Sequence, residues 1–414
     1  MRLLLTLILA ATSAAQSGPR ADVSRTTESL RGVSAVSREV AWASGTHGTY
    51  LRTVDAGRTW TPAQVLDAAT LDFRAVVVFS ANEAFLMSAG PGEQSRIYHT
   101  ADGGKHWQLQ FTNTNPKGFF DSMAFWDPKH GVVLGDPIPD EHGKLKFELL
   151  MTDDGQTWRQ IPSALLPEAE QGEGAFAASN SCIAILRGES RIGGASRPAK
   201  RKDDPSSFAQ SISASAPRQP INEEGASAPA DTNIWFATGG KVARVFHSPD
   251  RGQTWQVFNT PIIHGPESAG IFSIAFRDSL HGVIAGGDYK HPKDDGPNLA
   301  FTSDGGKTWI LSPLKPQAYF SAVTYDARVN QQAMEQQRAQ QIAGQGKKKI
   351  RVRPEMPQRL FIIGPDFVFD FRPPGNPRRL SGKSKQGFGF NAVASIPEGG
   401  ALIVGPKGSI TFLP

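Results

Sequence analysis

Short apolar runs recur along the chain, and polar turns separate them. SMAFWDPKHGVVLGD (122–136) and SIAFRDSLHGVIAGGD (273–288) both consist of an apolar strand, a polar turn and a second apolar strand that ends at Gly. VSAVSREVAWASG (33–45) and AVVVFSANEAFLMSAG (75–90) follow the same order. Apolar runs of this length between turn residues are typical of antiparallel strands. The pattern therefore predicts a chain built almost entirely of short strands.

Each of these segments continues through a third apolar strand into an octapeptide with the frame Asp-x-Gly-x-x-Trp. The five copies are TVDAGRTW (53–60), TADGGKHW (100–107), MTDDGQTW (151–158), SPDRGQTW (248–255) and TSDGGKTW (302–309). Their tryptophans follow one another at intervals of about 50 residues, with a single interval of roughly twice that length. A repeat of this period in a strand-rich chain predicts a β-propeller in which each repeat forms one blade.

Two further repeats keep the strands but lack the octapeptide. One combines FSAVTYD (320–326) with RLFIIGPDFVFDF (359–371), and the other is FNAVASIPEGGALIVGPKGSITFLP (390–414). Together with the five copies they make seven repeats. We therefore predict an all-β fold over residues 30–414, a seven-bladed β-propeller of four-stranded antiparallel blades.

The N-terminal residues are expected to serve export and ring closure. MRLLLTLILAATSAA (1–15) has an early Arg, an apolar run and a small-residue end, which is typical of a secretion signal too short to span a bilayer. We expect its removal, an exported periplasmic or extracellular protein, and no membrane-spanning segment. The last repeat ends after its third strand. Residues 20–28, within an N-terminal segment 16–29, are predicted to supply the fourth strand and so close the ring.

Two polar segments interrupt the repeats. Residues 187–230 account for the long interval; they are rich in Ser, Ala, Pro and charge, and they have too little apolar content to form a core. Residues 327–358 end in a basic run that contains Lys347, Lys348 and Lys349. We expect both to be flexible inserts. An electrostatic contact of the basic run with an acidic partner or membrane surface is one interpretation, and a solvated loop is the other.

The octapeptides are expected to be structural. An Asp two residues before a Gly, between two strands, forms a turn in which the carboxylate accepts backbone N–H groups and the Gly adopts a positive φ. Equivalent copies would lie far apart on a ring, whereas a catalytic site needs different residues that converge. The residues to which we assign this role are Asp55 and Trp60, Asp102 and Trp107, Asp153 and Trp158, Asp250 and Trp255, and Asp304 and Trp309.

The octapeptide S/T-x-D-x-G-x-T-W resembles the Asp-box, or BNR repeat, of sialidase-like β-propellers. Seven repeats behind a secretion signal are similar to the photosystem II stability and assembly factor family, and the resemblance covers about residues 30–414 outside the two inserts. It departs at Met151, where Ser or Thr is expected, and at His106, where Thr is expected. The resemblance implies a propeller fold. Enzymes, receptors and assembly factors all carry this repeat, so it does not by itself imply one activity.

Candidate binding residues lie in loops that join the second and third strands of a blade. These loops gather on one face with the blade-to-blade loops, and two of them, 135–147 and 286–298, are longer than a hairpin requires. We expect these two loops to form much of any partner contact, with one aromatic residue as the anchor. The binding residues predicted on this face are His47, Asp136, Asp288, Tyr289, Lys290 and His291.

Several candidates have a structural alternative. Asp136 precedes Pro and Asp288 follows Gly-Gly, which are positions typical of turn-forming Asp. His291 and the two Asp residues that follow it fit no strong metal-ligand spacing, so we predict no metal and no cofactor. The single cysteine, Cys182, lies in the apolar run CIAIL and is expected in the core.

The residues do not assemble a sialidase site. Such a site needs three arginines around a carboxylate, a Tyr activated by Glu, and an acidic proton donor. Only Tyr289 and Tyr319 are placed to reach the binding face, and arginines near the starts of inner strands are limited to Arg31 and Arg74. We therefore favour a non-enzymatic protein that acts as a protein-binding or assembly/stability factor. The alternative is a secreted glycoside hydrolase of the sialidase-like propeller type that uses two carboxylates, for example Asp121 and Asp288.

Charge adds little to this prediction. The net charge is +5 and the basic residues are scattered or lie in the inserts, which gives no reason to propose nucleic acid as a partner. The expected partner is a protein of the cell envelope, bound by a monomeric chain.

Overall fold

The computed structural model describes residues 18–186, 232–313, 318–329, 331–332, 358–373, 375, 377–382 and 389–414. The predicted secretion signal, the predicted insert 187–230 and most of the second insert lie outside these residues. Within the described residues, no helix is both long enough and apolar enough to cross a bilayer.

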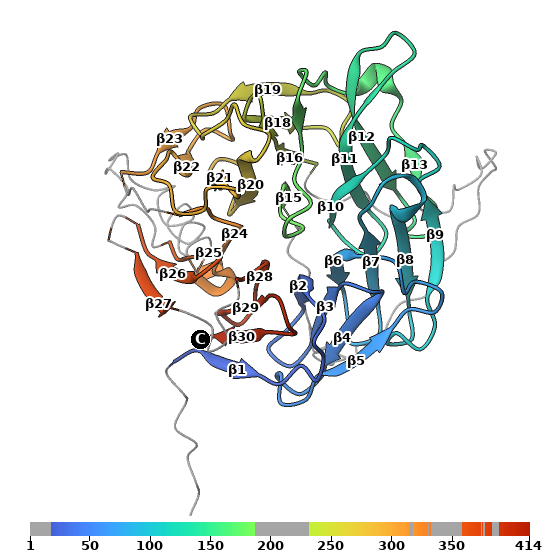
Figure 1. Ribbon diagram of the computed structural model, residues 1–414, viewed down its shortest axis with the longest axis vertical. Coiled ribbons are helices and arrows are strands. Elements are labelled where there is room, and N and C mark those ends of the chain that lie inside the picture. Colours follow the sequence, from blue (N-terminus) through green and yellow to red (C-terminus); the bar gives the residue numbers. More distant parts are fainter. Residues whose placement is uncertain are drawn as a thin grey trace, which may run out of the picture.

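Seven four-stranded antiparallel sheets stand around a common axis, so the predicted seven-bladed propeller is confirmed (Figure 1). In blades 1 to 3 the strands follow chain order from the axis outward. Blade 1 consists of β2 (Leu30–Ala35), β3 (Ala41–Gly45), β4 (Thr49–Thr53) and β5 (Thr61–Gln64), and blade 2 of β6 (Phe73–Val78), β7 (Ala84–Ser88), β8 (Arg96–Thr100) and β9 (Gln108–Thr112). Blade 3 consists of β10 (Phe120–Phe125), β11 (Gly131–Pro139), β12 (Leu145–Thr152) and β13 (Arg159–Gln160).

Blades 4 to 7 have the same order with small additions. Blade 4 consists of β15 (Ile183–Ile185), β16 (Ile234–Ala237), β18 (Arg244–Ser248) and β19 (Gln256–Asn259), and blade 5 of β20 (Ala269–Phe276), β21 (Gly282–Asp288), β22 (Leu299–Thr302) and β23 (Ile310–Leu311). Blade 6 consists of β24 (Ala322–Tyr325), β25 (Leu360–Gly364), β26 (Phe367–Phe371) and β27 (Arg378–Gly382). Blade 7 consists of β28 (Ala392–Ser395), β29 (Ala401–Val404), β30 (Ile410–Leu413) and β1 (Arg20–Asp22). Two short strands, β14 (Glu173–Gly174) and β17 (Gly239–Gly240), extend the sheet of blade 5, and the 3-10 helices are η1 (Gly92–Gln94) and η2 (Ser163–Leu165).

The hydrophobic core lies between neighbouring blades. Each apolar cluster joins two sheets: Trp42 and Tyr50 of blade 1, for example, pack with Phe73 and Leu86 of blade 2. Each blade has a neighbour on both faces, so its second strand is covered on both sides, and β3 and β7 are buried at every position. This explains why the second strands read as continuous apolar runs rather than as an alternation of apolar and polar residues.

The N-terminal strand closes the ring, as predicted. β1 pairs antiparallel with β30, from Arg20 opposite Phe412 to Asp22 opposite Ile410, and lies beside β30 at the rim (Figure 1). Asp22 also accepts a hydrogen bond from Trp60 Nε1 at 3.2 Å, which ties the closing strand to blade 1. The guanidinium of Arg20 lies 5.3 Å from the ring centroid of Phe412. The strand therefore covers the last edge of the propeller.

The octapeptides form the turns between third and fourth strands. In blade 1, Asp55 accepts hydrogen bonds from Thr59 N at 2.9 Å and from the hydroxyls of Thr53 and Thr59, while Gly57 N donates to Thr53 Oγ1 at 3.0 Å. Asp102, Asp250 and Asp304 make the equivalent contacts. Strand direction places these turns on the face opposite the loops between second and third strands.

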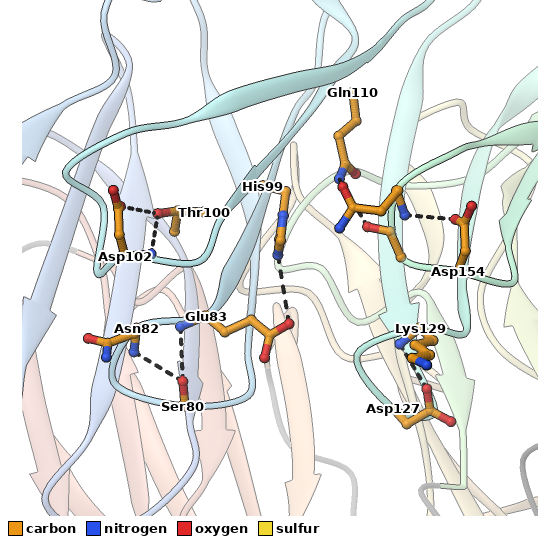
Figure 2. A network of polar contacts seen from close by, with 12 residues as sticks. Ser80, Asn82, Glu83, His99, Thr100, Asp102, Gln110, Asp127, Lys129 and Asp154 are labelled. Carbon is orange, nitrogen blue, oxygen red and sulfur yellow. Dashed lines mark hydrogen bonds and ion pairs between the residues drawn. The ribbon is translucent and has the colours of Figure 1, made fainter. Parts of the chain in front are cut away.

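Blade 3 departs from our assignment, because Asp154 and not Asp153 fills the turn. Thr157 N donates to Asp154 Oδ1 at 2.8 Å and Thr152 Oγ1 donates to it at 3.0 Å. Figure 2 shows Asp154 in this turn and, in blade 2, the contact between Asp102 and Thr100. This turn is one residue shorter than the turns of the other four copies. Gly155 is its single residue with a positive φ, whereas each of the other turns has two consecutive residues with a positive φ. Asp153 instead pairs with Arg251 of blade 4 at 2.6 Å.

The first strand of blade 4 is short. Within the sequence FAASNSCIAIL (176–186), which precedes the predicted insert, β15 covers only Ile183–Ile185. Residues 175–181 bond to blades on different sides of the channel and are called the strap below. Cys182 follows the strap and is buried in the core between blades 3 and 4. Burial raises the pKa of its thiol above the usual range.

Candidate functional site

The innermost strands share a β-bulge where they begin. In blades 1, 2, 3 and 5 the register with the second strand shifts across Arg31, Arg74, Asp121 and Phe272, so that each of these residues has no partner of its own. In blades 6 and 7, Ser321 N and Asn391 N bond to the carbonyls of Ile363 and Val404, which already face Ala322 and Ala392. Bulges redirect single side chains at the rims of sheets. The six residues, here called the bulge positions, therefore surround one end of the channel.

The strap is held across this end of the channel by bonds to several blades. Ala175 N donates to Asp136 Oδ1 of blade 3 at 3.0 Å, and Ala177 O accepts from Arg74 Nη1 of blade 2 at 3.0 Å. Ser179 Oγ donates to Ser321 O of blade 6 at 3.1 Å. Farther along, Asn180 Oδ1 accepts from Met123 N and Ser181 Oγ donates to Ser273 Oγ of blade 5. The strap thus links blades that are not neighbours.

A cavity of about 470 Å³ lies at this mouth of the channel. Five of the six bulge positions line it, together with the first half of the strap and residues from the loops of blades 5 to 7. The full lining is Arg31, Arg74, Phe176, Ala177, Ala178, Phe272, Tyr289, Tyr319, Ser321, Pro365, Gly389, Phe390 and Asn391. The second half of the strap lines a separate cavity of about 260 Å³ inside the channel. We refer to the larger space as the mouth cavity; its size is within the range of small-ligand and peptide side-chain pockets.

One wall of the mouth cavity is aromatic. Phe272 stacks on Phe176 with ring centroids 4.1 Å apart, and its edge faces Tyr319 at 4.8 Å and Tyr289 at 6.1 Å. Gly287 makes the approach of Tyr319 possible, because a Cβ at this residue, whose φ is +140°, would lie 2.9 Å from Tyr319 Cα. Burial raises the pKa of the Tyr319 hydroxyl well above its usual range. The hydroxyl therefore stays protonated and can donate a hydrogen bond.

Among the described residues, two arginines are the only charged residues that line the cavity. Arg74 Nε donates to Asp72 at 2.9 Å. The Nε of Arg31 is buried and has no hydrogen-bond partner among the described residues. Burial first, and then the charge of Arg74, lower the pKa of Arg31, while Asp72 opposes this shift. Two guanidinium groups thus share one carboxylate, and the cavity carries an excess of positive charge.

Of the binding residues predicted from the sequence, Tyr289 alone lines the mouth cavity. Its side chain is 49% exposed, so it can contact both the cavity and a partner above it. Lys290 is exposed on the same loop and does not line the cavity. His47 lies in the turn between β3 and β4, has a φ of 53°, and contacts Glu28 at 2.7 Å. The hydrogen bond to Glu28 raises the pKa of His47.

Asp288 has the role of a turn former. It accepts hydrogen bonds from Lys290 N at 2.9 Å and contacts His291 Nδ1 at 2.9 Å, while its own side chain is 7% exposed. Burial opposes ionisation, but the hydrogen bonds, led by that from His291, lower the pKa of Asp288. The same hydrogen bond raises the pKa of His291. Asp288 and His291 therefore shape the loop that carries Tyr289.

Asp136 lies beneath the strap and does not line the mouth cavity. Burial raises its pKa to about 6, and the bond from Ala175 N opposes this shift. Burial and the charge of Asp136 raise the pKa of Asp121 well above its usual range, and Asp121 Oδ2 has no hydrogen-bond partner among the described residues. The loop 135–147 is the end of the long β11–β12 hairpin, which extends beyond the ring (Figure 1). The loop 135–147 thus does not line the mouth cavity, whereas the loop 286–298 does so through Tyr289.

Sequence reasoning missed most of the mouth cavity, although a signal was present. A large apolar residue, a variable residue and a small residue follow one another where six inner strands begin. The six triplets are Leu30-Arg31-Gly32, Phe73-Arg74-Ala75, Phe120-Asp121-Ser122, Ile271-Phe272-Ser273, Phe320-Ser321-Ala322 and Phe390-Asn391-Ala392. The apolar residue is buried and the variable residue is the bulge position. Within the described part of the chain, no group of three or more His, Cys, Asp or Glu residues is placed to hold a metal ion.

Comparisons with known proteins concern the fold. No protein-family model matches the sequence, and no curated protein matches it. A structure described as YCF48 bound to D1 peptide has a TM-score of 0.56 and 15% identity, and the match covers 97% of this chain and 98% of that chain. The chain is a β-propeller. A catalytically inactive virginiamycin B lyase from Staphylococcus aureus with quinupristin has a TM-score of 0.57 and 10% identity, over 95% of this chain and 98% of that chain. The WD40 β-propeller domain of Doa1 has a TM-score of 0.53 and 10% identity, over 95% and 97% of the two chains.

Proposed function

We propose that this protein is an exported, non-enzymatic β-propeller of the Asp-box type that binds a protein partner of the cell envelope and acts as an assembly or stability factor. The observation that carries the proposal is the mouth cavity. It combines an aromatic wall, a partly exposed Tyr289 and two arginines on a rigid ring. Aromatic side chains and arginines are the residues that contribute most to binding at protein interfaces. The structure described as YCF48 bound to D1 peptide supports the proposal by fold, since it shows a propeller with a peptide partner.

One observation favours the alternative, a secreted glycoside hydrolase. Asp121 and Asp136 both have a raised pKa, as a proton donor requires. Their surroundings point to a structural role: Asp121 is 1% exposed, Asp136 Oδ1 holds the strap, and neither residue lines the mouth cavity. A substrate in the cavity would meet arginine and aromatic groups instead. We therefore place the hydrolase second.

Partner capture tests the proposed function. The full chain is used as bait with an envelope fraction of its host, and the bound proteins are identified by mass spectrometry. For an identified partner, Tyr289→Ala is expected to weaken binding by about 1–3 kcal/mol, because an anchoring aromatic side chain is removed. Its melting temperature should stay that of the native chain, since the side chain is half exposed.

Leu66→Ala is the matched control. Leu66 is 85% exposed in the connection between blades 1 and 2 and does not line the mouth cavity. Removal of residues 190–228, within the predicted insert, should likewise leave partner binding and melting temperature unchanged. Equal binding by Tyr289→Ala and the native chain, or turnover of aryl glycosides including a sialoside, would contradict the proposal.

A further inference from the structure

Arg31 occupies a position that costs free energy unless something binds it. Its buried Nε has no hydrogen-bond partner among the described residues, and the charge next to it, Arg74, has the same sign. Arg31 as a whole is half-buried, and partial loss of water beside a second positive charge is unfavourable while a single carboxylate, Asp72, serves both guanidinium groups. The fold does not need Arg31 in this place, since Ser321 and Asn391 occupy equivalent bulge positions in blades 6 and 7. The unmet hydrogen-bonding capacity therefore points to a ligand.

The charges of the mouth cavity define what this ligand is. Asp72 bonds Arg74 Nε through Oδ2, and its Oδ1 has no hydrogen-bond partner among the described residues. The charge of Arg74 also acts on Asp121, but burial raises the pKa of Asp121 well above its usual range, and Asp121 does not line the cavity. A monoanion would balance the remaining positive charge. The planar fork of a guanidinium group fits the two oxygens of a carboxylate. The protonated hydroxyl of Tyr319, which lies within reach of the electrostatic field of Arg31, offers a further donor.

The other lining residues define what the carboxylate is attached to. Phe272, Tyr319 and Phe390 form an apolar surface beside the arginines, and Phe272 already makes edge-to-face contacts with two tyrosines. An aromatic or similar apolar group would add to this cluster. The strap residues Ala177 and Ala178 complete the lining of the cavity.

We propose that the mouth cavity is a binding site for a carboxylate carried on an aromatic or other apolar group, with Arg31 and Arg74 holding the two oxygens and Phe272 facing the apolar group. Two sources have this chemistry: a free small acid and the C-terminal residue of a polypeptide. The second source would deepen the proposed function and rests on it, whereas the first is independent of it.

Calorimetric titration of the full chain at pH 7 separates the sources. The probes are 3-phenylpropionate, its neutral amide, and a tetrapeptide that ends in Phe with either a free or an amidated C-terminus. We expect at least one carboxylate form to bind with a dissociation constant of about 1 mM or lower, and its amide form to bind at least about tenfold more weakly. Binding of the free acid alone identifies a small-molecule site, binding of the free-ended peptide alone identifies a chain-end site, and binding of both identifies the shared chemistry.

Substitutions of Arg31 connect the binding to the cavity. Arg31→Gln should weaken the carboxylate form about tenfold or more, and Arg31→Lys, which keeps the charge but loses the planar fork, should lie between Arg31→Gln and the native chain. Arg58→Gln, an exposed change in an octapeptide turn, should bind as the native chain does. The melting temperature of Arg31→Gln should be equal to or above that of the native chain, since a partly buried positive charge next to Arg74 is removed.

The proposal is overturned if no carboxylate probe binds, if acid and amide bind equally, or if Arg31→Gln binds the carboxylate as tightly as the native chain. A lower melting temperature of Arg31→Gln together with unchanged binding would show that Arg31 is structural. Capture of a partner that depends on Tyr289 but is insensitive to Arg31→Gln would leave the proposed function standing while the carboxylate site fails.

Discussion

Aspartates occur in two opposite settings in this ring. Those of the octapeptide turns accept several hydrogen bonds: the Thr59 hydroxyl and then the Thr59 N–H lower the pKa of Asp55 to about 2. Those beneath the strap are short of donors, and burial raises the pKa of Asp136 to about 6. The chemical type of the residue is therefore a poor guide to its role, whereas its supply of N–H and O–H donors is a good one.

The choice between Asp153 and Asp154 gives the first prediction. Asp154→Ala removes the acceptor for Thr157 N and for two hydroxyl groups, so it should lower the free energy of unfolding by about 1–2 kcal/mol. Asp153→Ala removes exposed ion pairs with Arg159 and Arg251, and it should cost less. Urea denaturation of both variants measures the difference. An equal or larger loss for Asp153→Ala would show that the turn does not depend on Asp154.

The sequence could not decide this case from position alone. In the other four copies the third residue of the octapeptide is an Asp, and the same count selects Asp153 in MTDDGQTW. One residue is missing between the Asp and the Gly, and the adjacent Asp-Asp pair conceals the loss. The hydroxyl two residues before the functional Asp is a better marker: Thr53 precedes Asp55 as Thr152 precedes Asp154.

The sequence allowed the strands of the blades to be predicted, but it did not allow the course of one connection, the strap, to be predicted. The seven blades and the closing strand were predictable, because octapeptides and paired apolar runs repeat with a fixed order. The strap was not. Its sequence, FAASNSC, resembles the beginning of an inner strand, but in the structure it bonds to residues of blades 2, 3, 5 and 6. The mouth cavity was missed for a related reason, since its residues differ from blade to blade.

The closing strand gives a prediction about a whole element. Removal of residues 1–24 should lower the melting temperature and increase hydrogen exchange at the amides of β30, because the edge of that strand loses its partner. Trp60 would also lose its hydrogen bond to Asp22. Removal of residues 1–15, the predicted secretion signal, is the control and should change neither quantity. Protection of β30 that is the same in both truncated forms would contradict the closing role of β1.

The stability of the whole molecule depends on pH through both kinds of aspartate, and the two kinds change it in opposite directions as pH rises. A carboxyl group whose pKa is lowered, such as that of Asp55, stabilises the fold above its unfolded pKa, and this is lost as pH falls toward about 2. A carboxyl group whose pKa is raised, such as that of Asp136, stabilises the fold below its unfolded pKa, and this is lost as pH rises through about 6. Because each contribution changes between the unfolded pKa of 3.8 and the folded pKa, the two groups together should give the greatest stability at about pH 4.

Asp136→Asn isolates the alkaline side of this profile. The amide oxygen can still accept the bond from Ala175 N, but no charge develops beneath the strap. At pH 8 the variant should be more stable than the native chain by about 1–3 kcal/mol, and at pH 4 the two should be nearly equal. Denaturation curves at both pH values provide the measurement. A variant that is less stable than the native chain at pH 8 would mean that the ionised form of Asp136 is the stabilising one.

The bulge positions differ from their neighbours in the chain, because the neighbouring residues stabilise the blade and the residue at the bulge position does not take part in strand pairing. At each of the six triplets the buried apolar residue and the small residue satisfy the blade, and the residue between them is left outside the strand pairing. Arg, Arg, Asp, Phe, Ser and Asn occupy these places in one chain. Five of the six positions, all except the buried Asp121, line the mouth cavity. A combinatorial library randomised at these five codons would therefore vary the lining of one cavity while the scaffold stays constant, much as hypervariable loops vary on an antibody framework.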